Sequence, residues 1–481
     1  MSRLALAVLN GCLVDEDGQR HGDVGVEDGR IVEIAEPGGL GEATKVIDAR
    51  GKWILPGFVD AHFHCRAPDH PEREDFFSGT SAAAAGGATT VLEMPVADVG
   101  VSTVERLLAR QTLAESQAVV DFGLFAGCGS LSKEVIKGLA DAGAIGFKVF
   151  THRPGPGRTT AFDGLCLTDN ADLMTALEMV RETGLPCAFH AEDDSLLQYF
   201  LKEGAQRATP TERYRDSRPP AVEAMAVARL SVLAESTGAR VHIVHVTSRW
   251  VLDLIRAAQA RGISLTAETC PHYMFFTDDA AQEVGVWAKV APPLRELADA
   301  AALIEGVADG TLAVICSDHA PFSDADRAGV DIMEAPSGVP GVEIFGHLAL
   351  DAALRGQLPL PAVIRALTAG PAQLYGLYPR KGALRVGSDA DLLVYDPNAE
   401  TTVETASWIS RSRASARLFE GRKHRGRVNM TIVRGELVYV GGRIVGQSGY
   451  GRMVRPLVET GAQLAKPFSH TSGPASPIPA V

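Results

Sequence analysis

The sequence has few cysteines, and they form no recognisable metal or disulfide pattern. Seven cysteines are scattered over 481 residues, and no two of them stand in a CxxC arrangement. A disulfide framework and a zinc ribbon both need closely and regularly spaced cysteines. Both classes are therefore excluded.

An excess of positive charge is also absent. Lys and Arg number 46 against 59 Asp and Glu, which gives a formal net charge of −13 at pH 7. Nucleic acids and anionic membranes are bound by basic surfaces, so we expect neither as a partner. The chain has no apolar run of about 20 residues that could span a membrane, and its first residues lack the apolar region of a signal peptide. We therefore expect a cytoplasmic protein.

The two ends of the chain are rich in short β-like segments. Residues 1–55 and about 382–446 alternate apolar runs with glycine and acidic turn signals. This pattern predicts a small β-sandwich domain built from residues 1–55 and 376–462. The Pro/Ser-rich residues 463–481 are expected to be a disordered tail.

Residues 56–375 alternate apolar, strand-like runs with Ala/Leu-rich helical stretches. Eight such alternations predict an α/β fold, a parallel (β/α)8 TIM-like barrel, whose strands are buried on both faces. The expected strands are 57–64, 88–95, 119–127, 144–150, 185–192, 239–246, 263–270 and 312–319. Helices are expected at 101–118, 170–183, 220–237, 249–261 and 296–309.

Histidine and aspartate recur at the carboxyl ends of the expected strands. His62 and His64 are two residues apart, so both imidazoles lie on one face of a strand. His190, His245 and Asp318 close three later strands. Because the active sites of such barrels lie at this end, the pattern predicts a site for Zn, Mn or Fe(II).

Lys148 lies in GFKVF, at the end of a strand that should be buried. One interpretation is a lysine that extends its amine to the barrel rim. The other is a desolvated, neutral amine that reacts with CO2 to form a carbamate. Such an anionic group can bridge two cations, which would make this a two-metal site.

These residues resemble the cyclic amidohydrolases, which include hydantoinases, dihydropyrimidinases, allantoinases and dihydroorotases. The resemblance spans nearly the whole chain, through PGFVDAHFH, AAAAGGATTVLEMP, GFKVF, FHAED, VHIVHVTS, ETCPHY, APPLRE, SDHAPF and KGALRVGSDADLLVYDP. It implies two divalent metal ions, with zinc preferred and Mn, Fe or Co as alternatives. It also implies a homo-oligomer, a dimer or a tetramer.

The same resemblance implies a role for each candidate ligand. His62, His64 and Asp318 would hold one ion, His190 and His245 the other, and N6-carboxylated Lys148 would bridge them. Asp318 would also move the proton between the attacking water and the leaving nitrogen.

The implied reaction is hydrolysis of the C–N amide bond of a cyclic ureide or imide, as in hydantoinases and allantoinases. Dihydroorotase is the alternative. A third interpretation is a non-catalytic scaffold of the same fold. Residues able to bind a metal are present at all six ligand positions, which favours an enzyme.

Arg66 follows the first metal pair as HxHxR, where dihydroorotases bind a substrate carboxylate. The alternative is a rim arginine paired with one of the nearby acids, Asp69, Glu72, Glu74 or Asp75. Two departures weaken the dihydroorotase reading: Val96 stands where that family has asparagine, and Phe322 where it has histidine.

Further residues are candidates for contact with the substrate. Arg153 occupies the position of the hydantoinase tyrosine, and either His152 or Arg153 is a candidate donor to the developing oxyanion, although their loop could equally be a lid. His319 could bond the substrate or support a ligand, and Gly338 lies in a loop whose backbone groups could contact the ring.

Overall fold

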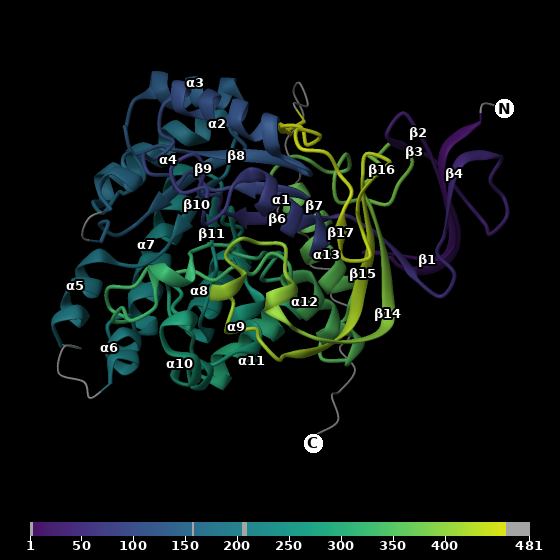
Figure 1. Cartoon of the computed structure of the whole chain (residues 1–481). Coiled ribbons are helices and arrows are strands. Elements are labelled where there is room, and N and C mark those ends of the chain that lie inside the picture. Colours follow the sequence, from purple (N-terminus) through teal and green to yellow (C-terminus); the bar gives the residue numbers. More distant parts are fainter. Residues whose placement is uncertain (1–2, 156–157, 204–208, 458–481) are drawn as a thin grey trace.

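A computed structural model describes residues 3–155, 158–203 and 209–457. Two units are visible: a helix-covered barrel and a sheet that contains strands from both ends of the chain (Figure 1). The expected tail at 463–481 lies outside the described residues. None of the helices in the described part is long and apolar enough to cross a membrane.

The barrel is an eight-stranded parallel sheet in sequential order, which confirms the predicted (β/α)8 fold. A backbone bridge between Phe63 and His319 brings its first and last strands together, and the His64 amide donates to the His319 carbonyl at 2.9 Å. The strands are β6 (Phe58–Phe63), β7 (Ala88–Glu93), β8 (Asp121–Gly127), β9 (Gly146–Phe150), β10 (Cys187–His190), β11 (Val241–Ile243), β12 (Leu265–Thr269) and β13 (Val314–Ile315).

Almost every residue of these strands is buried, as expected for strands with the barrel core on one face and helices on the other. The outer layer consists of α1 (Phe76–Ala85), α2 (Val104–Gln117), α3 (Lys133–Ala142), α4 (Asn170–Thr183), α5 (Asp194–Glu203), α6 (Pro210–Asp216), α7 (Pro220–Thr237), α8 (Arg249–Ala260), α9 (Pro271–Phe275), α10 (Asp278–Val284), α11 (Leu297–Ala308), α12 (Phe345–Leu354), α13 (Leu360–Leu367) and α14 (Ala369–Leu374).

Side-chain caps fix where several of these helices begin. Thr103, Ser132 and Ser248 each accept a hydrogen bond from the backbone amide three residues later, at the starts of α2, α3 and α8. Such a bond satisfies one of the amides that a first helical turn leaves unpaired. The five helices expected from the sequence are all present, with ends that differ by at most three residues.

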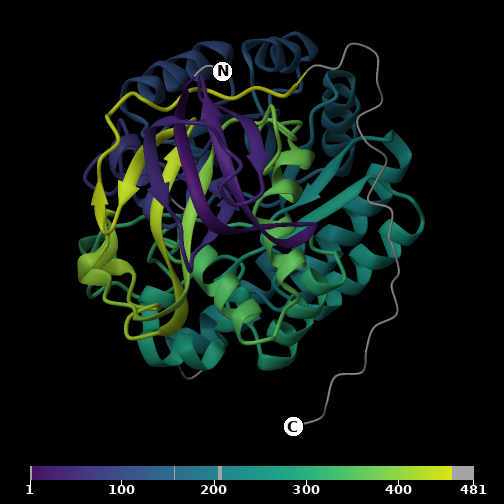
Figure 2. The same cartoon turned by 90° about the vertical axis from the view of Figure 1, so that its right-hand side faces the viewer.

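The second unit is a nine-stranded mixed sheet that both termini share. Strand β5 pairs antiparallel with β14, so Leu55 lies opposite Leu393. Figure 2 shows this sheet, in purple and yellow-green, in front of the barrel. Its strands are β1 (Leu4–Asp15), β2 (Gly18–Glu27), β3 (Arg30–Ala35), β4 (Ala43–Asp48), β5 (Trp53–Pro56), β14 (Leu392–Thr402), β15 (Lys423–Val433), β16 (Glu436–Val440) and β17 (Arg443–Ile444).

A buried lysine connects the two units. The Lys381 amine lies 2.5 Å from an oxygen of Asp121, the first residue of β8, and 2.8 Å from Asp391, just before β14. A third carboxylate, that of Asp389, lies at 3.0 Å. The sheet is therefore held against the barrel by charged groups as well as by apolar packing, and the domain boundaries at residues 55/56 and 375/376 remain predictions.

Candidate metal centre

The predicted metal ligands come from five different strands and meet at one end of the barrel. The imidazole centroids of His62 and His64 are 5.4 Å apart. His245 lies 5.4 Å from His62 and 4.6 Å from His190. Parallel strands end on the same side of a barrel, so four histidines that are distant in the sequence become one buried cluster.

Asp318 faces the first two of these histidines. Its Oδ1 lies 3.5 Å from Nε2 of His62 and 3.7 Å from Nε2 of His64. The three possible ligand atoms lie within 4.8 Å of one another. Two imidazoles and one carboxylate at this spacing are a donor set that suits Zn, Mn or Fe(II).

Several polar atoms at this site are buried without a hydrogen-bond partner, among them Nζ of Lys148 and Nδ1 of both His64 and His245. Burial lowers the pKa of Lys148 to about 8 and holds the pKa values of His64 and His245 well below their usual range. The imidazoles are therefore neutral, which is the state that binds metals. The residues fit a divalent metal centre.

The backbone at two of these positions adopts an unusual conformation. His245 and Asp318 have φ angles of 40° and 42°, in a region that residues other than glycine rarely occupy. Asp60 fixes the neighbouring Ser317 by accepting its amide at 2.9 Å and its hydroxyl at 2.5 Å. Strained backbone held by its surroundings is frequent at functional sites.

Two buried glutamates orient two of the histidines through hydrogen bonds. Oε1 of Glu268 lies 2.6 Å from Nδ1 of His62, and its Oε2 lies 3.1 Å from Nε2 of His242. Because an ionised carboxylate accepts the Nδ1 proton, Nε2 of His62 is left free as the ligand atom. Glu192 is bonded in the same way to Nε2 of His190, at 2.7 Å.

The sequence patterns did not single out these glutamates. Both stand at strand ends, Glu268 in ETCPHY and Glu192 in FHAED, where a carboxylate in an apolar run is a usable signal. Glu192 also accepts a bond from Arg218, which lies between α6 and α7. Arg218 thus supports His190 through Glu192, although no sequence motif connects the segment of Arg218 to His190.

Arg66 lies at the same end of the barrel. Its Nε donates to the carbonyl of Pro321 at 3.2 Å, and its guanidinium carbon lies 4.7 Å from the ring centroid of Phe322. Within the described ranges, none of the four nearby acids considered from the sequence is within ion-pair distance of it; they are Asp69, Glu72, Glu74 and Asp75. Its terminal nitrogens remain available to another partner.

Arg153 is engaged elsewhere. Its guanidinium lies 2.7 Å from Oδ2 of Asp194 at the start of α5, and 69% of its side chain is exposed. The neighbouring His152 is buried, with its ring 5.0 Å from that of His190. Of His152 and Arg153, His152 is therefore the one beside a candidate metal ligand.

His319 and Gly338 lie behind the Asp318 loop. The His319 ring is fully buried, stacks on Phe63 at 5.1 Å and has Nε2 3.3 Å from Glu74, contacts that suit packing. Gly338 has a φ of 139°, and a Cβ added there would lie 2.4 Å from the Cβ of Ala320. Only glycine fits this turn.

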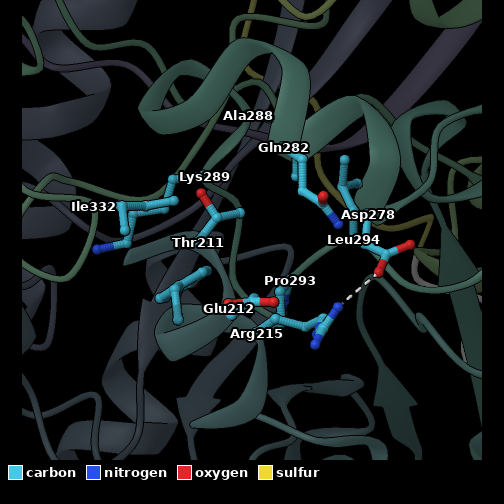
Figure 3. Close-up of a pocket in the computed structure, with 12 residues that line it drawn as sticks. Thr211, Glu212, Arg215, Asp278, Gln282, Ala288, Lys289, Pro293, Leu294 and Ile332 are labelled. Atoms are coloured by element: carbon cyan, nitrogen blue, oxygen red, sulfur yellow. Dashed lines mark hydrogen bonds and ion pairs between the residues drawn. The ribbon is translucent and has the colours of Figure 1, made fainter. Parts of the chain in front are cut away.

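A separate hollow lies between α6 and α10 (Figure 3). Arg215 and Asp278 form an ion pair of 3.0 Å at its edge, and Lys289 also lines it. None of the predicted metal ligands lines this hollow. We therefore assign the chemistry to the histidine cluster.

Comparisons with known proteins agree with the geometry. A family model described as the amidohydrolase family matches residues 53–438. An allantoinase of Rubrobacter xylanophilus is 36% identical over 464 residues, which cover 96% of this chain and 100% of the relative. An L-hydantoinase of Paenarthrobacter aurescens is 32% identical and covers 93% of this chain and 97% of its own length.

The solved structures include a similar fold. The L-hydantoinase (dihydropyrimidinase) from Arthrobacter aurescens superposes with a TM-score of 0.89 at 31% identity, over 94% of this chain and 100% of that one. The likeness therefore extends to the barrel and to the sheet built from both termini.

Proposed function

Because the chain belongs to the amidohydrolase family, we propose that it hydrolyses a ring C–N amide bond of a cyclic ureide, as allantoinases and hydantoinases do. The observation that carries this proposal is the convergence of His62, His64, His190, His245 and Asp318 at one end of the barrel, where Lys148 has a buried amine without a hydrogen-bond partner. The named relatives are allantoinases and hydantoinases, so the dihydroorotase alternative is not favoured. The complete donor set also argues against a non-catalytic scaffold.

The proposed ligands divide into two groups. His62, His64 and Asp318 hold one divalent ion, and His190 and His245 hold a second. Zinc suits imidazole and carboxylate donors best, with Mn, Fe or Co as alternatives. When bound, the ions supply Lewis acidity toward the amide carbonyl and toward water.

Lys148 is proposed to carry an N6-carboxyl group. Its amine is buried, has no hydrogen-bond partner and has a pKa lowered to about 8 by burial, so a useful fraction is neutral near pH 7. A neutral amine attacks CO2, an N–C bond forms and one proton is released to water. The product is an anionic carbamate whose oxygens can join two cations.

Asp318 is proposed to move the proton. Its carboxylate accepts a proton from the attacking water and delivers it to the leaving ring nitrogen, which needs one group that faces both. The strained backbone at Asp318 and the bonds from Ser317 to Asp60 hold this carboxylate toward the histidines.

Of the proposed substrate residues, Arg66 and Gly338 have suitable surroundings. Arg66 has free donors, and the loop around Gly338 can present backbone groups. Arg153 is bonded to Asp194 and His319 is buried, so we assign these two to support of the loops.

A hydrolysis panel tests this function. The purified chain, loaded with Zn or Mn, is assayed against allantoin, hydantoin, dihydrouracil, dihydroorotate and a cyclic imide. We expect ring opening of allantoin or hydantoin, and at least a 100-fold loss in Asp318→Asn because its general acid–base group is gone. Failure of the metal-loaded protein to open any of the five rings would refute the proposal.

We also propose a cytoplasmic dimer or tetramer. Every cysteine of the chain is free of disulfide bonds, which is usual in a reducing compartment. Light scattering on the purified protein measures the assembly state, and a monomer would contradict the proposed dimer or tetramer.

A further inference from the structure

A buried arginine, Arg295, is bonded to two segments that lead to the metal centre. It lies in APPLRE, between the short helix η3 (Gly285–Ala288) and α11, and only 7% of it is exposed. Its Nε donates to the hydroxyl of Thr247 at 3.0 Å, and its Nη1 donates to the carbonyl of Arg218. Because a guanidinium presents its N–H groups in a rigid fork, these two bonds fix the two segments relative to each other.

The bond to Thr247 leads to His245, which precedes Thr247 by two residues. Glu223 on α7 also fixes Thr247, since it accepts the backbone amide at 3.1 Å and the hydroxyl at 2.5 Å. The guanidinium of Arg295 lies 3.9 Å from the same oxygen of Glu223 that accepts the hydroxyl. These contacts hold the backbone directly after His245, whose φ of 40° is rare for a residue other than glycine.

The bond to Arg218 leads to His190. The guanidinium of Arg218 donates to Oε2 of Glu192, and the same oxygen lies 2.7 Å from Nε2 of His190. A carboxylate bonded to one imidazole nitrogen fixes the orientation of the ring and leaves the other nitrogen as the ligand atom. Arg295 is therefore connected to both histidines of the proposed second ion.

The proposed first ion has different supports. Glu268 is bonded to Nδ1 of His62 at 2.6 Å, and Asp60 accepts the amide and the hydroxyl of Ser317. In the part of the chain that the structure describes, no side-chain hydrogen bond joins Glu268 or Asp60 to Arg295. The two ions are thus held by ligands that separate groups orient.

We propose that Arg295 is a positioning residue for the second ion, whose affinity it sets without changing that of the first. This inference rests on the two-metal arrangement of the proposed function and deepens it. The rings of His190 and His245 are 4.6 Å apart, and one ion can bind both only while their relative orientation is kept.

Stepwise removal of zinc tests this role. The full-length, zinc-loaded protein is titrated with a chelator, and the zinc that remains bound is measured by mass spectrometry. Wild-type protein should hold two ions per chain. In Arg295→Gln the affinity of one ion should fall by about 10- to 100-fold, the range for loss of a group that supports a metal ligand. The affinity of the other should stay within about twofold.

A double variant identifies which ion is weakened. Glu268→Gln should weaken the ion bound by His62, so Glu268→Gln combined with Arg295→Gln should weaken both ions. One tightly held ion in the double variant would contradict the proposal, because both substitutions would then act on the same ion.

Thr247 provides a milder variant. Thr247→Val removes the hydroxyl that Arg295 and Glu223 share and should weaken the same ion, whereas Thr247→Ser should retain its affinity. Thr247→Val decides the question if Arg295→Gln does not fold.

Arg240 is the matched control. It also donates to two backbone carbonyls, those of Gly184 and Leu374, but it lies just before β11, at the opposite end of that strand from His245. Arg240→Gln should keep both zinc affinities.

The outcomes separate this role from the proposed function. If the zinc-loaded wild-type protein opens no ring, the proposed function fails. If rings are opened and Arg295→Gln keeps both affinities, or loses both equally, the function stands and the positioning role is wrong. A wild-type chain that opens rings with a single bound ion would also overturn the positioning role.

Discussion

Lys148 is the residue on which the two-metal interpretation depends. Lys148→Ala should lose both bound ions and at least 100-fold in turnover, because the bridging ligand is removed. A short carboxylic acid added to the assay should restore part of the activity. Metal analysis of the purified variant and a turnover assay measure both effects.

Lys289 offers a matched control for that experiment. It is also buried, and burial lowers its pKa to about 7, but its amine donates to the carbonyls of Met333 and Ala335. Lys289→Ala should keep its metal. Normal metal content and turnover in Lys148→Ala would contradict the carbamate bridge.

Glu268 is expected to increase the metal affinity of the site through its hydrogen bond to His62. Glu268→Gln replaces the acceptor at Nδ1 of His62 with a weaker one, and we expect metal affinity to fall by about 10- to 100-fold. Competition with a chelator measures this. Glu72→Gln, on an exposed loop, is the control, and equal affinities in the two variants would remove the orienting role.

The meeting of the candidate metal ligands at one end of the barrel was predictable because strand ends in a barrel share one side, so the order of the strands alone places these residues together. The supporting groups were not singled out: Glu192 stands only two residues from His190, whereas the roles of Arg218 and Glu268 depend on partners from other segments. The role of Glu268 follows from its hydrogen bond to His62, which is 206 residues away in the sequence.

At the scale of elements, the turn at Gly338 shapes the loop beyond Asp318. Gly338→Ala forces a Cβ into Ala320 at a φ of 139°, and we expect a loss of about 1–3 kcal/mol in unfolding free energy and a raised KM. Gly329→Ala has a φ of 77° with open space around it, so it should lose only about 1 kcal/mol with KM unchanged. Denaturant unfolding and steady-state kinetics compare them; equal KM values would exclude a role for the loop in binding.

The barrel strands were predictable from their apolar runs, whereas their ends were not. The run at 312–319 forms only a two-residue strand, β13, because Ser317 bonds back to Asp60 and Asp318 takes a positive φ. Likewise β11 ends at Ile243, before His245 turns toward the centre. These strands end early because the backbone turns at His245 and Asp318. An apolar sequence pattern does not predict such a turn.

At the scale of the whole molecule, Lys381 joins the terminal sheet to the barrel. Lys381→Met removes the cation that Asp121, Asp389 and Asp391 share and leaves Asp391 without one, while Asp121 keeps Arg434 and Asp389 keeps Arg380. We expect the unfolding free energy to fall by about 3–5 kcal/mol. The loss should shrink at acid pH, since burial raises the pKa of Asp391 and protonation removes the stranded charge. Thermal unfolding between pH 5 and 8 measures it.

Lys137→Met is the control for that variant, since Lys137 forms an exposed pair with Asp141 on α3. Its unfolding free energy should change by less than about 0.5 kcal/mol. Equal stabilities of the two variants would show that the charged cluster does not hold the units together.

The use of both termini in one unit was predictable from their similar β-rich composition. The order of the strands was not, because the pairing of β5 with β14 joins segments more than 300 residues apart, and such a register is set by packing. The tail lies outside the described residues, so its expected disorder remains a prediction.

Anomalous diffraction from crystals grown with zinc and bicarbonate tests the central claim most directly. Two metal peaks should lie among the four imidazoles, joined by added density on the Lys148 amine. Crystals with no metal peak at this end of the barrel, and with the amine unmodified, would contradict the account.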